Sequence, residues 1–221
     1  MRLMPAVLTL AQVEEKRIGL VLAAMEILET SGIDALTLRH LADRAGVSRS
    51  TPYLYFKDKM ALIDAVRVHG LCTLIQTSKD AIADIDCNSE YVENMRRLGS
   101  VYIDFGLGHP ALYQLIFVSG LPDEDMSDEL SQAIDQHRTL LMAPMKAAYA
   151  AGVLSMPPER LDLVLWSAVH GLLTLRHAGY LGEDEDFCQV RADVENILAL
   201  GFLNLDHRRK PDWGRVIRKG E

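Results

Sequence analysis

One segment, residues 37–62, constrains the fold of this chain more than any other part of its sequence. It reads TLRHLADRAGVSRSTPYLYFKDKMAL, which indicates two short helices joined by a tight turn and followed by a third helix. Thr37 can cap the first helix, whose apolar residues at positions 38, 41, 42 and 45 share one face. Gly46 is the turn residue, and Ser48 can cap a second helix that is short, polar, basic and aromatic. Such a helix suits the major groove of DNA, so the segment predicts a helix-turn-helix DNA-binding protein.

The rest of the chain predicts an all-α fold of about nine helices. Nearly half of the 221 residues are apolar and only 6% are aromatic, which favours a helical globular protein over a β-sandwich or barrel. Gly32 and Gly152 are expected to end helices, and Pro110 and Pro158 to begin them. We find no convincing strand and no internal repeat.

The composition changes near residue 66, which suggests a domain boundary. We expect a three-helix DNA-binding domain at 12–66, a helical effector-binding and dimerisation domain at 67–206, and an irregular basic tail at 207–221. The long helix that opens near Asp58 is expected to bridge the two domains and to run to about Ile85.

The net charge of −8 is unusual for a DNA-binding protein, but it is unevenly distributed. Residues 1–66 hold eight basic and eight acidic side chains, so the whole excess of acid lies beyond residue 66. Phosphate contact depends on the charge within a Debye length of about 8 Å. The modest basic patch around the turn therefore remains compatible with DNA, and predicts a moderate salt dependence of binding.

Several classes of protein are disfavoured. The three cysteines are far apart in the sequence and form no CxxC pair, which fits a reducing cytoplasm and not a disulfide framework. No uncharged run approaches transmembrane length, so no membrane partner is expected. The sequence lacks GxSxG, P-loop, GxGxxG and HExxH motifs. We therefore expect no enzyme, no metal site and no cofactor.

Residues 18–66 resemble the DNA-binding domain of the TetR (tetracycline-repressor) family of bacterial transcription regulators. Two further pieces, HPALYQLIF at 109–117 and Trp166 with His170 and Gly171, resemble a WHG-type variant of that family's ligand-sensing domain. The matching residues of the first region are Ala24, Leu28, Gly32, Thr37, Leu41, Ala42, Ala45, Gly46, Val47, Ser48, Thr51, Tyr53, Tyr55, Phe56, Lys59 and Leu62.

The sequence departs from the family pattern at two positions. Pro52 stands where Leu or Ile is common, and its ring would crowd the carbonyl of Ser48. We expect it to tilt or tighten the start of the recognition helix. Leu54 replaces a frequently basic residue, which removes one possible phosphate contact.

The DNA contacts are predicted from side-chain chemistry together with the resemblance. Arg49 lies near the start of the recognition helix, where an arginine can donate two hydrogen bonds to guanine O6 and N7. Other side chains are expected to touch base edges or phosphates, and helix N-termini favour anions. The predicted set is Thr37, Arg39, Arg49, Ser50, Thr51, Tyr53, Tyr55 and Lys59.

The resemblance implies a homodimer that binds a palindromic operator in double-stranded DNA and is released from it by a small-molecule effector. The last two long helices, 158–181 and 184–205, would pair with the partner's copies as a four-helix bundle. The residues that we expect to line the effector pocket are Tyr102, Phe105, Tyr113, Phe117, His137, Met142, Met145, Trp166 and His170.

Two alternatives remain open at this point. The chain could bind DNA without sensing a small molecule, or it could be an all-helical enzyme that keeps a vestigial helix-turn-helix. The effector, the operator sequence and the choice between repression and activation are not specified by the sequence.

Overall fold

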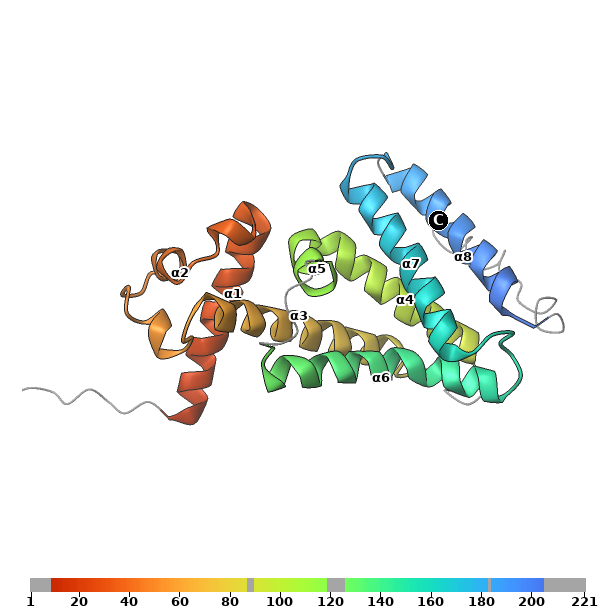
Figure 1. Ribbon diagram of the computed structural model, residues 1–221, viewed down its shortest axis with the longest axis horizontal. Helices are drawn as coiled ribbons and strands as arrows, with labels where there is room; N and C mark the ends of the chain where they lie inside the picture. The colour runs from red at the N-terminus through yellow and green to blue at the C-terminus, as the bar shows by residue number, and fades with distance from the viewer. Residues whose placement is uncertain (1–8, 87–89, 119–125, 183, 205–221) are drawn as a thin grey trace, which may run out of the picture. The chain divides into compact units, whose positions relative to one another are not determined.

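The computed structural model describes residues 9–86, 90–118, 126–182 and 184–204, and Figure 1 shows their helices. These residues form eight α-helices and one short 3-10 helix, with no strand beyond an isolated bridge between Leu154 and Leu203. The predicted all-α fold is confirmed. The helices are α1 (Leu10–Ala35), α2 (Leu38–Arg44), η1 (Pro52–Leu54), α3 (Lys59–Ala81), α4 (Tyr91–Gly108), α5 (Pro110–Phe117), α6 (Asp128–Ala150), α7 (Pro158–His177) and α8 (Asp184–Phe202).

The chain folds into two compact units, each built from two stretches of sequence. Among the described residues, the first combines 9–77 with 105–118 and 126–137, and the second combines 78–86 and 90–104 with 138–182 and 184–204. The domains predicted from the sequence are defined by their functions, so their bounds stay a prediction. The predicted basic tail at 207–221 lies outside the described residues.

Glycine and proline set the helix ends where the sequence places them. Gly32 adopts φ 76°, and the regular turns of α1 stop there although the helical segment continues to Ala35. Gly152 adopts φ 73° behind α6, and its amide donates to the carbonyl of Tyr149 while the amide of Val153 donates to that of Ala148. This pair of bonds is a Schellman motif. Pro110 and Pro158 are the first residues of α5 and α7, as predicted.

The core of the first unit is formed by one face of α1 together with α2 and α3. Ile27 and Leu28 of α1 expose 2% of their surface or less, and Leu41 of α2 and Leu62 of α3 expose none. Because these side chains come from all three helices, their burial fixes the helix-turn-helix on a rigid base.

The second unit has its own core, built around the C-terminal half of α6. Met142 and Met145 of α6 cluster there with Leu161 of α7 and with Phe202 and Leu203 at the end of α8. Figure 1 shows α7 and α8 side by side. The helices α3 and α8 end at Ala81 and Phe202, a few residues before the ends that the sequence predicts.

Candidate nucleic-acid interface

The turn of the helix-turn-helix is fixed by hydrogen bonds at both ends of α2. The Thr37 hydroxyl caps α2 by accepting from the amide of His40 at 3.1 Å, which confirms its predicted capping role. At the other end Gly46 adopts φ 65°. Its amide donates to Asp43, and the amide of Val47 donates to the carbonyl of Ala42 at 3.0 Å. This is a second Schellman motif, and its positive φ is the reason that glycine stands at position 46.

The segment after the turn differs from the predicted recognition helix. Its only regular element is the 3-10 helix η1, and the Ser48 hydroxyl lies 3.0 Å and 2.8 Å from the hydroxyls of Ser50 and Thr51 instead of capping a backbone amide. Pro52 gives the physical reason. An α-helix starting at Ser48 needs an N–H at position 52, which proline lacks. The amide of Thr51 donates to the Ser48 carbonyl instead, at 2.9 Å. The expected tightening therefore extends over the whole segment.

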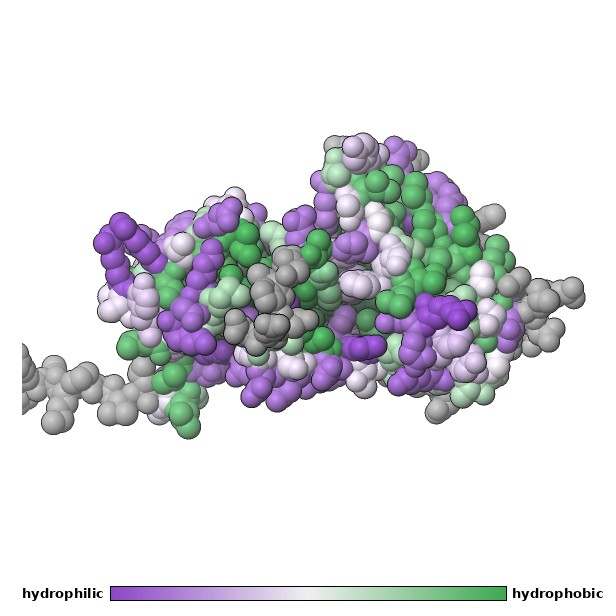
Figure 2. All heavy atoms as spheres, in the orientation of Figure 1, coloured by the Kyte–Doolittle hydropathy of each residue, from purple (hydrophilic) through white to green (hydrophobic). Residues whose placement is uncertain are grey.

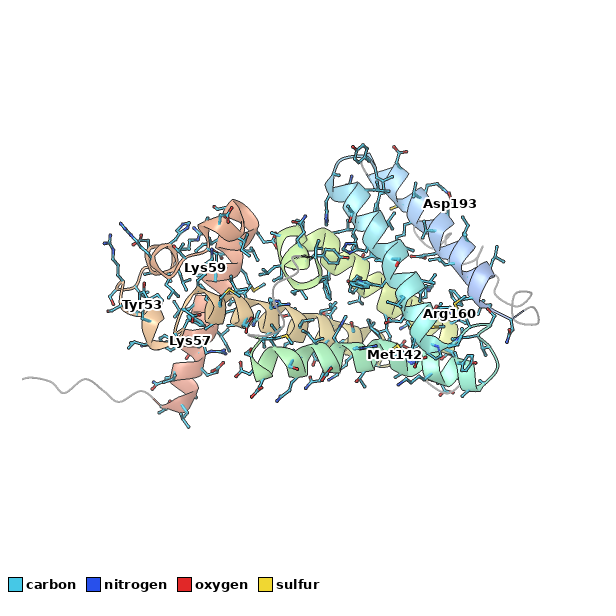
Figure 3. The ribbon with its side chains drawn as sticks, viewed as in Figure 1. Tyr53, Lys57, Lys59, Met142, Arg160 and Asp193 are labelled. Atoms are coloured by element: carbon cyan, nitrogen blue, oxygen red, sulfur yellow. The ribbon has the colours of Figure 1, made fainter. Side chains whose placement is uncertain are left out.

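The 3-10 turn separates the segment into a buried side and an exposed side. Pro52 and Phe56 point into the protein, and only 2% of Phe56 is exposed. On the other side Arg49 and Ser50 are exposed, and Tyr53 keeps 59% of its surface in solvent. Figure 3 shows Tyr53 at the outer edge of this unit. A basic, a hydroxyl and a phenolic side chain are thus presented together to solvent.

The remaining predicted DNA contacts lie around this segment. Thr37 and Arg39 at the start of α2 are exposed, while Thr51 and Tyr55 are half-buried. Lys59, at the start of α3, donates to the carbonyl of Ile33 at 3.0 Å. An ammonium group has three donors, so this bond anchors the side chain and leaves two for a phosphate.

One basic side chain near the turn is already paired. Arg44 donates to a single carboxylate oxygen of Glu26 through both Nε and Nη2, at 3.1 Å and 2.6 Å. This bond ties α2 to α1. Arg44 thus has a structural role, and it does not belong to the predicted set of DNA contacts.

The nine residues predicted to line an effector pocket fall into separate groups. In the first unit Phe117 lies between Tyr113 and His137, with ring centroids 5.3 Å and 5.8 Å away. Phe105 is also buried in that unit, and its ring lies 5.5 Å from the ring of His109 at an interplanar angle of 53°. Burial lowers the pKa of His137 to about 4, so its imidazole is neutral at pH 7.

The other predicted pocket residues lie in the second unit. The Trp166 indole donates to the Tyr102 hydroxyl at 3.1 Å, and its ring is 6.0 Å from that of His170. Met142 and Met145 belong to the buried core of that unit. The role of all nine residues toward an effector stays a prediction.

A cavity of about 180 Å³ opens elsewhere in the second unit, among α4, α7 and α8. None of the nine predicted residues lines it. Sequence reasoning missed it because a cavity between helices depends on packing, which helical periodicity does not report. The available signal was the small side chains at Gly99, Ala192 and Ala199, all of which line the cavity.

Two carboxylates fasten later helices to the DNA-binding part of the first unit. Glu29 of α1 accepts from the amides of Ala111 at 3.1 Å and Leu112 at 3.0 Å, at the N-terminus of α5. Asp64 of α3 accepts from the amide of Ser127, just before α6, at 3.0 Å. Both satisfy amides that have no partner within their own helix. Neither carboxylate was predicted from the sequence.

Metal ligation and membrane insertion find no support in the described part of the chain. No group of three or more His, Cys, Asp or Glu side chains there could hold a metal ion. Among the same residues, no helix combines the length and the apolar character that crossing a bilayer requires.

Family models match both parts of the chain. Residues 20–66 match the model for bacterial regulatory proteins of the tetR family, and residues 95–193 match the model for a tetracyclin repressor-like C-terminal domain. The first match covers the turn, the 3-10 segment and the start of α3.

Curated relatives give the same assignment. The class D tetracycline repressor protein of Escherichia coli is 47% identical over 49 residues, so the chain spans only about a fifth of that repressor's length. The HTH-type transcriptional regulator SrpR of Pseudomonas putida is 36% identical over 203 residues, covering 87% of this chain and 88% of that protein. This chain belongs to the TetR family of DNA-binding transcriptional regulators.

Solved structures share the fold. A protein with unknown function from Rhodococcus sp. RHA1 is 27% identical, with a TM-score of 0.74 over 85% of this chain and 95% of that one. A TetR family transcription regulator from Marinobacter aquaeolei VT8 reaches a TM-score of 0.68 at 18% identity, over 89% of this chain and all of that one. The second likeness concerns the fold alone.

Proposed function

We propose that this regulator is a homodimeric repressor that binds a palindromic operator and is released by a small-molecule effector. The observation that carries the proposal is the exposed set of Arg49, Ser50 and Tyr53 on a segment whose other face is buried. A protein that recognises a DNA sequence needs polar side chains that are exposed to the duplex and held on a rigid base. Since the chromosome is in the cytoplasm, cytoplasmic action is part of the same proposal.

Each proposed contact follows from its chemistry. Arg49 reads a guanine edge, and Ser50 and Thr51 touch neighbouring bases. The other five predicted residues bind phosphates and fix the register of the protein on the duplex. The role of Lys59 is compatible with its bond to the Ile33 carbonyl, because that bond holds the ammonium at the start of α3.

Exposed apolar side chains on α7 and α8 support the homodimer. Ile197 and Leu200 of α8 are 68% and 58% exposed, and Leu163 of α7 is 59% exposed. Figure 2 shows hydrophobic side chains gathered over these two helices. An exposed apolar surface of this kind marks an interaction site. A two-fold dimer also brings a second reading segment roughly 34–36 Å along the duplex, as a palindrome needs.

The carboxylate of Glu29 couples α5 to the DNA-binding part of the first unit. It caps α5 from α1, so a displacement of α5 pulls directly on the first helix of the DNA-binding part. A second close contact joins α3 to α5. A Cβ atom at Gly70 of α3 would stand 3.0 Å from side-chain atoms of both Leu112 and Ile116. Because α5 is held by α1 and α3, its movement is transmitted to both.

The direct test is selection of binding sites from a pool of random duplexes. The proposal expects an inverted repeat whose half-sites lie about one helical turn apart, bound by two protomers. Selection of a single asymmetric half-site, or of no sequence at all, would refute the operator part of the proposal.

Whether the protein represses or activates transcription needs a separate test, because one relative is named an activator. The HTH-type transcriptional activator FasR of Mycolicibacterium smegmatis is 30% identical over 104 residues. With the selected operator placed within a reporter promoter, a repressor lowers expression and an activator raises it. We expect lowering, and a rise would establish the alternative.

A further inference from the structure

The cavity among α4, α7 and α8 has the size of a small ligand. Its volume is about 180 Å³, similar to that of an enclosed apolar cavity of about 150 Å³ that binds benzene, but this cavity is partly open to solvent. Its walls are mainly aliphatic, with Ile103 of α4 and Leu172 of α7 among them, and Phe202 of α8 adds an aromatic ring. These three side chains are all buried.

Small residues keep the cavity open. Gly99 of α4 has no side chain, and a Cβ atom added there would meet no described neighbouring heavy atom within 4 Å. Ala192 and Ala199 line the cavity from α8. The space therefore arises from three small residues on two of its helices, and a larger side chain at position 99 would grow into it.

The charged groups that line the cavity are matched by neighbouring polar groups. Arg96 donates to both oxygens of Glu93, at 2.8 Å and 2.7 Å. Arg191 donates to Glu195 at 2.8 Å and to the Ser100 hydroxyl at 2.8 Å. An anionic ligand would have to displace these carboxylates, so the described lining offers no uncompensated positive charge to attract it.

We infer that this cavity is the effector site and that its ligand is an uncharged, mainly apolar molecule about as large as a single aromatic ring. The inference rests on the proposed effector-released repressor. Helix α8 carries Ala199 on the cavity wall and its neighbours Ile197 and Leu200 on the exposed apolar face. A ligand that spreads α4 from α8 therefore alters the proposed dimer surface, and it shifts the protein toward the state that it binds better.

Benzene tests the ligand class on the full-length protein. At a concentration ten times its Kd, benzene should raise Tm by about 3–6 °C. Benzoate, which has the same ring and a negative charge, should raise it by less than about a tenth as much. No rise with benzene, or an equal rise with benzoate, would overturn the inference.

The variant Gly99→Leu tests the location. Leucine is the better helix former in a helix interior, and the side chain enters open space, so the variant should fold. It should lose the benzene response. Gly19→Leu is the matched control, because Gly19 is also a helix-interior glycine with room for a Cβ atom but lies outside the cavity lining. A benzene response that survives in Gly99→Leu would place the site elsewhere and overturn the inference.

Release of DNA separates this inference from the function on which it rests. With the selected operator, benzene should weaken binding of the wild-type protein at least about tenfold and leave Gly99→Leu unaffected. If benzene binds in the cavity but the wild-type complex stays intact, the effector role assigned to the cavity fails, while DNA binding and repression stand. If no operator is selected at all, the proposed function fails first.

Discussion

His137 illustrates how one buried side chain links stability to pH. Its pKa is lowered from 6.5 to about 4 by burial, so between these values the unfolded chain binds a proton that the folded protein does not. The stability from the neutral imidazole is complete above pH 6.5 and is lost as the pH falls toward 4.

We therefore expect the free energy of unfolding to decrease between pH 6.5 and 4, with a contribution from His137 of at most about 1.4 kcal/mol per pH unit. In His137→Gln, whose side chain does not titrate, the free energy of unfolding should fall less steeply as the pH is lowered. Urea unfolding at a series of pH values and at fixed protein concentration measures this slope. Identical slopes in the two proteins would contradict the assignment, whatever their absolute stabilities.

For some single residues the sequence predicts the structural role correctly, and for others it does not. Thr37, Gly46 and Pro110 have the predicted roles because capping, positive φ and the missing proline N–H are local properties. Pro52 departs from the family pattern, and its effect exceeds the predicted tilt. Removing one amide from so short a segment eliminates the α-helix, since few other bonds are left to sustain it.

At the scale of elements, the contact between α1 and α5 links two helices that are far apart in the sequence. Glu29 accepts from two backbone amides at the N-terminus of α5. A hydrogen bond to a charged group contributes about 1.5–3 kcal/mol net, and because the two Glu29 bonds are only part-buried, solvent lowers their contribution. Sequence patterns could not reveal it, because the partners are 82 and 83 residues apart.

Glu29→Ala should lower the free energy of unfolding by about 1–3 kcal/mol, because two amides lose their acceptor. Its exposed counterpart on the same helix, Glu15→Ala, should change stability by less than about 0.5 kcal/mol. Urea unfolding of both variants provides the measurement. Equal effects would mean that the Glu29 bonds contribute nothing to holding α5.

The cavity, too, could not be predicted from sequence patterns. The predicted pocket residues have aromatic, thioether or imidazole side chains, whereas the cavity exists because Gly99, Ala192 and Ala199 leave space between helices. The small residues can be seen in the sequence, but whether they leave a cavity depends on how the helices pack.

At the scale of the whole molecule, the proposed homodimer depends on the exposed apolar face of α7 and α8. The double substitution Ile197→Lys with Leu200→Lys should produce a folded monomer, because both side chains are more than half exposed and contribute little to the protomer's own core. Light scattering gives the mass. Leu10→Lys, which changes an exposed leucine of α1, should leave the dimer intact.

A monomer should also bind the selected operator far more weakly, since the gain from holding two reading segments on one duplex is lost. Should the double variant remain dimeric, the face that joins the protomers must be sought on other helices.

The central claim is that the segment following Gly46 reads DNA, and fluorescence anisotropy with the selected operator tests it directly. Arg49→Ala should weaken specific binding by about 1–3 kcal/mol, or roughly 5- to 150-fold, and should relax the base preference at one position of each half-site. Lys146→Ala, which removes an exposed positive charge from α6, should leave affinity within about twofold. Equal affinities of the wild-type and Arg49→Ala proteins, with an unchanged sequence preference, would contradict the claim.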